Sequence, residues 1–192
     1  MASPANGRHG YLCAKRIGAH GTRYLCGAIL VPVRDVAGRL HGLQRIYSGG
    51  HKRFTQNTSK RGHFFMIGEP REGIIGIAEG FATAATIYEL TRLAVAVAFD
   101  AGDLQPVAEA IQQTYPQHRI LLCADNDRDV QGNPGRTKAI AAAEAVGGTV
   151  LWPEFWNPSS RGTDFNDLFM EEGPGAVQKI FNQAGVSHVS NS

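Results

Sequence analysis

The sequence predicts an α/β fold, in which a parallel sheet flanked by helices follows a small, strand-rich, basic lobe. Three observations predict it. From residue 74 onward, continuous apolar runs alternate with amphipathic segments, a pattern typical of parallel sheets buried on both faces. The N-terminal part carries shorter β-type runs separated by turn formers, and the net charge changes sign between the two parts.

The N-terminal part is expected to form its own lobe. Turn formers cluster at residues 68–73, where the charge also changes sign, so we expect a basic strand-rich lobe at 1–70 and an α/β domain at 71–192. Residues 25–34 and 40–47 are expected to be strands joined by a turn at 35–38, and residues 64–67 are a short apolar run.

Helices of the α/β domain are predicted from apolar spacing and from capping residues. Apolar side chains spaced i, i+3, i+4 and i+7 from Phe81 to Tyr88 indicate a helix. Asp103 is expected to cap the next helix, and Asn133-Pro134 to start a third that ends at Gly147. A last helix starts near Pro174. The expected strands are residues 74–78, 94–99, 119–124 and 149–152.

Charge is distributed very unevenly along the chain. Residues 1–63 contain eleven Lys and Arg and a single acid, Asp35, for a net charge of +10. The other residues contain eight basic and sixteen acidic side chains, for a net charge of −8. Such asymmetry is expected of a protein that holds phosphates and metal ions together, although an uneven solvated surface would give the same pattern.

Several classes of protein are disfavoured by the sequence. The three cysteines never adopt a C-x-x-C spacing, and the seven histidines are scattered without metal-ligand spacing. No apolar run reaches the roughly 18 residues of a membrane span, and no secretory pattern opens the chain. P-loop, dinucleotide-binding and G-x-S-x-G motifs are absent. We therefore expect a cytoplasmic protein that has no membrane association.

Acidic residues follow the predicted strands one after another. Glu79 follows the first strand, Asp100 the second, and Asp125, Asp127 and Asp129 the third. Carboxylates gathered at one rim repel each other unless cations neutralise them, and oxygen ligands suit Mg²⁺ or Mn²⁺. The series at residues 125–129 is not an EF-hand, because the positions that need Gly and Glu hold other residues. The sequence therefore predicts a divalent-metal site at the carboxyl ends of the strands.

Asp164 has two interpretations that the sequence leaves open. It lies with Asp167 in a turn-rich segment beyond the fourth strand. It either caps a short helix through residues 166–168 or belongs to the functional site.

The ordered motifs resemble the Toprim signature, a Glu after one strand and Asp-x-Asp after a later one. The resemblance spans about residues 72–172 and is similar to the Toprim domains of plasmid- and phage-type primases. Residues 27–67 resemble the strand-rich segment that precedes the Toprim domain in that group. The motifs that carry the resemblance are Ile77-Ala78-Glu79-Gly80, Cys123-Ala124-Asp125-Asn126-Asp127, residues 99–102, residues 132–138 and residues 162–168.

The resemblance implies roles for individual residues. Glu79 matches a metal ligand or general acid/base, and Asp125 and Asp127 match a metal-binding pair. Asp164 matches the acid of a conserved segment, although Thr163 stands where that segment has Lys. Many bacterial primases carry an Asp four residues after the Glu, where this chain has Thr83; Asp129 or Asp100 is the expected substitute in a second-metal site.

The resemblance implies primer synthesis on single-stranded DNA by metal-dependent nucleotidyl transfer. Alternatives are a Toprim nuclease or topoisomerase-like activity, or a non-catalytic nucleic-acid-binding fragment of a primase-helicase. The absent zinc-finger and P-loop patterns favour a fragment, or a protein that needs a helicase or other primase domains as partners. Residues expected to contact template and nucleotide phosphates are Arg45, Lys52, Arg53, Lys60, Arg61, Arg128, Arg136 and Lys138.

Overall fold

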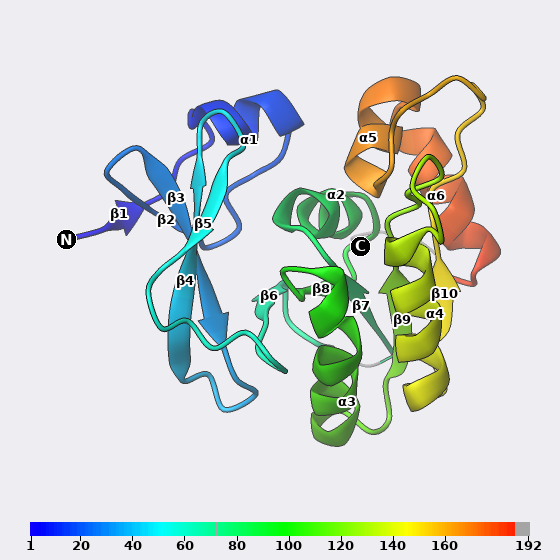
Figure 1. The fold of residues 1–192 in the computed structure, drawn as a ribbon, viewed down its shortest axis with the longest axis horizontal. Coiled ribbons are helices and arrows are strands. Elements are labelled where there is room, and N and C mark those ends of the chain that lie inside the picture. The colour runs from blue at the N-terminus through cyan, green and yellow to red at the C-terminus, as the bar shows by residue number, and fades with distance from the viewer. Residues whose placement is uncertain (72, 187–192) are drawn as a thin grey trace, which may run out of the picture.

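The computed structural model describes residues 1–71 and 73–186, which fold around two five-stranded sheets (Figure 1). The first, sheet A, is an antiparallel meander in the order β1-β2-β3-β4-β5. It confirms the expected strand-rich lobe. Its elements are β1 (Ser3–Pro4), α1 (Gly10–Lys15), β2 (Arg23–Leu25), β3 (Ala28–Arg34), β4 (Leu40–Tyr47) and β5 (Lys52–Phe54).

Two turns set the register of sheet A. The strand expected at 25–34 is confirmed from residue 28 onward as β3, but not before it. Cys26 and Gly27 both have positive φ and form a two-residue loop between β2 and β3. Positive φ at both central residues matches the right-handed twist of hairpin strands. The turn expected at 35–38 is confirmed, with Gly38 at φ +79° donating its N–H to the carbonyl of Asp35.

The second sheet, sheet B, has the order β10-β9-β7-β8-β6 and is parallel except for its edge strand β6. The parallel sheet is as predicted. The apolar run at 64–67 is grouped with the basic lobe by the sequence, whereas in the structure it forms β6, which pairs antiparallel with β8. The chain therefore changes sheets before residue 65. The strands are β6 (Phe65–Ile67), β7 (Ile74–Ala78), β8 (Ala94–Val97), β9 (Arg119–Cys123) and β10 (Thr149–Leu151).

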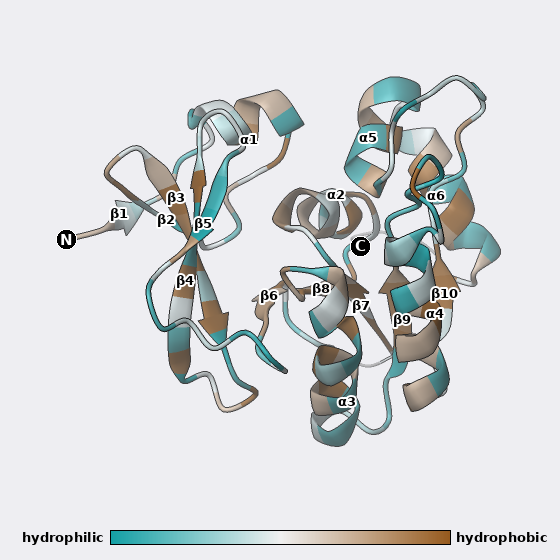
Figure 2. Cartoon of the chain, viewed as in Figure 1, coloured by the Kyte–Doolittle hydropathy of each residue, from teal (hydrophilic) through white to brown (hydrophobic). Residues whose placement is uncertain are grey.

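Helices cover both faces of sheet B, and Figure 2 shows its central strands as largely hydrophobic. Side chains alternate between two apolar clusters, so that Ile75 and Ile77 face α3 and α4 while Val95 and Leu121 face α2, α5 and α6. The predicted covering of both faces is confirmed. The helices are α2 (Phe81–Thr91), the 3₁₀ helix η1 (Ala101–Asp103), α3 (Leu104–Thr114), α4 (Pro134–Val146), α5 (Phe165–Glu172) and α6 (Pro174–Gln183).

Sheet A shares its apolar core with the α/β part. Ile29, Val31 and Ile46 of sheet A belong to the same buried cluster as Phe81 of α2 and Phe165 of α5. The two parts are therefore joined by packing as well as by the chain, and the boundary at residue 70 stays a prediction. Within residues 1–71 and 73–186, no helix has the length and apolarity to cross a bilayer.

Candidate active site

Three neighbouring strands of sheet B deliver acidic side chains to one edge. β7 lies between β8 and β9 and runs parallel to both, so the three strands end together. Glu79 directly follows β7, and Asp125 and Asp127 follow β9. Asp100 lies just beyond β8, at the start of η1. Ligands of open α/β sheets bind at this edge.

Glu79 and Asp125 each bury a carboxylate oxygen that has no hydrogen-bond partner among the described residues, Oε1 and Oδ1 respectively. Burial, followed by the charge of Asp127, raises the pKa of Glu79 to about 7. Burial, followed by the charge of Glu79, raises the pKa of Asp125 to about 8. Unsatisfied buried carboxylates are costly unless a cation neutralises them, and an all-oxygen donor set fits a hard divalent ion.

The start of α4 lies directly against this cluster of acids. A Cβ atom on Gly135 would lie 2.9 Å from the carbonyl oxygen of Asp125 and 3.0 Å from Oε1 of Glu79, so only glycine fits. The Gly135 N–H donates to Oδ2 of Asp127 at 3.3 Å, and Asn133 Oδ1 accepts the backbone N–H of Asp127 at 2.9 Å. The positive end of the helix dipole therefore faces the carboxylates.

Asp164 combines the two roles that the sequence left open. Its Oδ1 accepts the backbone N–H of Asp167 at 2.8 Å and so caps α5. Its charge also helps raise the pKa of Glu79 and Asp125, so it lies toward the same acidic cluster. Burial raises the pKa of Asp164 itself. The helix cap and the site contribution are therefore compatible.

The other acids lie in different surroundings. Asp100 caps η1 by accepting the Asp103 N–H at 3.2 Å, and its charge helps raise the pKa of Glu79. Asp103 occupies the N-cap position of α3 as expected, but its side chain makes no capping hydrogen bond and instead pairs with Lys60 at 3.4 Å. Asp129 is exposed and pairs with Arg161 at 3.9 Å, so the structure does not place it with Glu79.

Side chains along β5 point alternately to the two faces of sheet A, so the basic residues expected to bind nucleic acid lie on different faces. Lys52 is the cross-strand partner of the buried Ile46, so both lie on the inner face of sheet A. Its Nζ would lie 3.9 Å from a Cβ on Gly80, and its charge lowers the pKa of Glu79 and Asp125. Lys52 therefore faces the acidic cluster. Arg53 pairs with Arg45 on the opposite, outer face of the sheet.

The remaining basic candidates are distributed around the site. Lys60 forms ion pairs with Asp100 and Asp103, which tie the segment before β6 to η1. Arg128 donates to the carbonyl of Ser160 at 2.9 Å, and the Arg136 guanidinium lies 3.9 Å from the ring centroid of Trp152. Arg61 and Lys138 are both exposed.

Sequence reasoning missed the residues that position the acids. Gly135 and Asn133 were noted only as part of a motif and a helix start, although a glycine inside a predicted helix signals close approach of another group. The hydrogen bond from Thr83 to Oδ2 of Asp164, at 3.0 Å, joins α2 to α5. No sequence signal indicates it.

The family model for the Toprim domain matches residues 74–175, which is more than half of the 192-residue chain. This chain belongs to the Toprim domain family. The expected Toprim fold is therefore confirmed, and the match contains Glu79, Asp125, Asp127 and Asp164.

Known relatives of this Toprim chain include DNA primases. It is 41% identical over 133 residues to DNA primase TraC of Escherichia coli, and this match covers 65% of the chain. The chain spans only 12% of the length of that relative.

Solved structures show a similar fold. The primase fragment of the bacteriophage T7 primase-helicase protein has a TM-score of 0.63 at 16% identity, with 90% of this Toprim chain and 74% of that chain covered. The DnaG primase catalytic domain bound to ssDNA has a TM-score of 0.53 at 18% identity, with 82% and 51% covered. Because 90% of the chain is covered in the T7 comparison, the likeness extends into sheet A.

Proposed function

We propose that this chain carries the nucleotidyl-transfer site of a DNA primase, which joins nucleotides into a primer on single-stranded DNA. The observation that carries the proposal is the pair of buried, unpartnered carboxylate oxygens on Glu79 and Asp125 at the end of a Toprim sheet. The identity to TraC supports the same activity. A cluster of this kind is suited to holding metal-bridged phosphates.

Glu79, Asp125 and Asp127 are the proposed ligands of Mg²⁺ or Mn²⁺. A bound ion supplies charge neutralisation and orients the phosphates. The protein contributes positioning: Gly135 and Asn133 fix the loop that carries Asp127, and Lys52 directs a positive charge at the acids from sheet A. Burial raises the pKa of Glu79 to about 7 in the metal-free protein, so the proton that it then holds near neutral pH would leave as the ion binds.

Single-stranded DNA and nucleotides are the proposed partners. The DnaG catalytic domain was solved bound to ssDNA, and the T7 fragment comes from a primase-helicase. Because this chain spans 12% of TraC, we further propose that it works with other primase domains or a helicase. Exposed basic groups such as Arg61 and Lys138 are available for phosphate contacts.

A topoisomerase-like activity is less well supported. It needs an accessible nucleophilic tyrosine near the acids. Tyr11 is the candidate, because the charge of Asp164, after burial, helps raise the pKa of its phenol. Tyr11 is only 4% exposed, and burial raises the pKa of its phenol well above the ordinary value. A buried phenol that resists ionisation is a poor nucleophile.

A primer-synthesis assay tests the proposal directly. Labelled nucleotides, single-stranded DNA and Mg²⁺ or Mn²⁺ are incubated with the chain, alone and within a full-length TraC-type primase. Glu79→Gln should reduce incorporation by roughly 10²–10⁴-fold while DNA binding persists, because Gln neither exchanges a proton nor binds metal as an anion. Glu144→Gln, an exposed change on α4, is the matched control.

Each outcome of this assay separates the proposed function from an alternative. Wild-type protein that binds DNA but incorporates nothing with either metal, in either setting, would support the non-catalytic module. Metal-dependent cleavage of DNA without incorporation would support the nuclease.

A further inference from the structure

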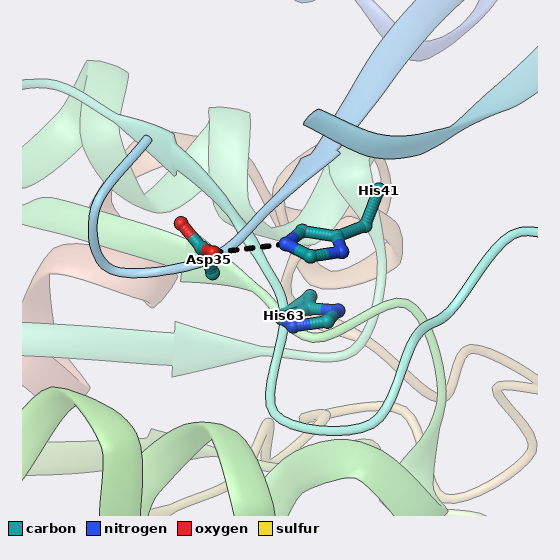
Figure 3. Close-up of side chains that lie close together, drawn as sticks. All are labelled: Asp35, His41 and His63. Carbon is teal, nitrogen blue, oxygen red and sulfur yellow. Dashed lines mark hydrogen bonds and ion pairs between the residues drawn. The ribbon is translucent and has the colours of Figure 1, made fainter. Parts of the chain in front are cut away.

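Asp35 and His41, six residues apart, meet the more distant His63 in the cluster that Figure 3 shows. Asp35 lies in the turn after β3, His41 on β4, and His63 on the segment that enters β6. Each offers one ligand atom, and the three atoms lie within 4.8 Å of one another. The spacing of these residues in the sequence did not predict the cluster, because the fold brings His63 to His41.

We propose that Asp35, His41 and His63 form a second metal site, separate from the Toprim acids, that takes Zn²⁺ or a similar divalent transition metal. Two imidazole nitrogens and one carboxylate oxygen are the donors of many zinc sites with three protein ligands, whose fourth position holds water. Imidazole donors select against the hard ions Mg²⁺ and Ca²⁺. The two sites therefore differ in the metal that they favour.

The ring of His63 already has the proton arrangement that a metal ligand needs. Its Nδ1 donates to the carbonyl oxygen of Ser59 at 2.8 Å. A carbonyl only accepts, so the proton lies on Nδ1 and the lone pair of the neutral ring lies on Nε2. Across residues 1–71 and 73–186, nothing hydrogen-bonds to that Nε2. Metal-binding histidines almost always hold their second nitrogen in this way.

Hydrogen bonds hold the Asp35 and His41 side chains in place, and a metal ion can replace those made by the ligand atoms. Oδ1 of Asp35 accepts the backbone N–H groups of Ala37 and Arg39, both at 3.0 Å, which fixes the carboxylate. Oδ2 accepts from His41 Nε2 at 2.9 Å and from Arg39 Nε at 2.7 Å. A bound cation replaces the proton between His41 and Asp35, and the Arg39 side chain, 77% exposed, moves into solvent at little cost.

To close around an ion, the ligand atoms must move closer together and the His63 ring must turn. Ligand atoms of a tetrahedral zinc site lie about 3.3 Å apart, given a Zn–N distance of about 2.0 Å. His41 and His63 are stacked, with ring centroids 3.8 Å apart and planes 15° from parallel, so the His63 ring must tilt out of the stack. The metal would then fasten the β3–β4 turn to the segment before β6, beside the bridge between Arg34 and Phe64.

Zinc binding by the chelator-treated full chain tests the proposal. We would use an Asp125→Asn, Cys13→Ser, Cys26→Ser background, because it removes one proposed ligand of the Toprim site and the two exposed thiols as competing ligands. Titration calorimetry with Zn²⁺ should show one site per chain and a higher Tm. Co²⁺ in place of Zn²⁺ should give the visible absorption of a protein-bound ion.

Variants of the ligands decide the outcome. His41→Ala and His63→Ala should each weaken Zn²⁺ binding by more than about 100-fold, since even supporting residues of metal sites account for 10–100-fold. His51→Ala, an exposed histidine at the start of β5, should bind like the background protein. Equal Zn²⁺ affinity in both variants would overturn the site. If an alanine variant fails to fold by circular dichroism, His63→Gln is used instead, and retained affinity there overturns it equally.

Discussion

The hydroxyl of Thr83 donates a 3.0 Å hydrogen bond to Oδ2 of Asp164, which connects α2 to the first turn of α5. Oδ1 of the same carboxylate accepts the backbone N–H of Asp167. Asp164 is thus held by both oxygens close to the Toprim acids. An acid at position 83, as many bacterial primases have there, would place a second negative charge against Asp164. A neutral donor at this position removes that repulsion.

Thr83→Val should lower the free energy of unfolding by about 1–3 kcal/mol, because it leaves a buried carboxylate oxygen without its donor. Thr83 is 1% exposed, so water does not replace the lost partner. Urea denaturation of both proteins measures the difference. Thr83→Ser keeps the hydroxyl and should lose less stability than Thr83→Val. Equal loss in the two variants would mean that the methyl packing, not the hydrogen bond, stabilises this contact.

Gly135→Ala should weaken Mg²⁺ binding and primer synthesis together, by at least about tenfold, since misplacement by about 1 Å is costly in such sites. The new carbon would lie 2.9 Å from the Asp125 carbonyl oxygen and 3.0 Å from Glu79 Oε1, so α4 must move away from the acids. Gly175→Ala is the matched control, because a Cβ there meets nothing within 4 Å. Calorimetry with Mg²⁺ measures the effect, and unchanged affinity would contradict it.

Much of the fold could be predicted because the local pattern determines it. The spacing from Phe81 to Tyr88 and the left-handed Gly147 marked α2 and the end of α4 correctly. What failed depends on partners distant in sequence. The apolar run at 64–67 says that a strand is buried but not which sheet it joins, and Cys26 gave no sign of the positive φ that splits 25–34 into two strands.

In the candidate site, too, some residues could be predicted from the local sequence pattern and others depend on partners distant in sequence. Glu79, Asp125 and Asp127 were found because parallel strands end at one edge, which is a property of the fold class. The opposite directions of Lys52 and Arg53 follow from strand alternation, but only once the pairing of β4 with β5 is known. A glycine within a predicted helix indicates that some group approaches closely, but that the group is Glu79 follows only from the fold.

The metal-free protein should become less stable as pH rises from about 4 to about 8. Glu79 and Asp125 have folded-state pKa values of about 7 and about 8, against 4.5 and 3.8 without the fold. Over that range the folded chain holds protons that the unfolded chain has lost, so the slope of stability with pH is negative. Tm measured at several pH values in chelator should fall accordingly.

Mg²⁺ should reverse this trend, because it replaces the bound protons and its affinity therefore rises with pH. Asp125→Asn supplies the control. The neutral amide should flatten the fall in Tm and remove the response to Mg²⁺. A wild-type Tm that is independent of pH and of Mg²⁺ between pH 5 and 8, a range set by the shifted pKa values, would contradict the site.

Arg45 and Arg53 should account for part of the affinity for single-stranded DNA. They are direct cross-strand partners on the outer face of sheet A, an arrangement of like charges that is unfavourable until an anion lies between them. Deleting the lobe would expose the core that it shares with α2, so the double variant Arg45→Ala, Arg53→Ala is the better probe. It should weaken binding and reduce the slope of log affinity against log salt by about 1.4, since each lost phosphate contact on a single strand accounts for about 0.7.

Lys179→Ala, an exposed change on α6, should leave the slope unchanged. Fluorescence anisotropy with a labelled oligonucleotide at several salt concentrations measures it, and equal slopes in all three proteins would exclude this face from DNA binding.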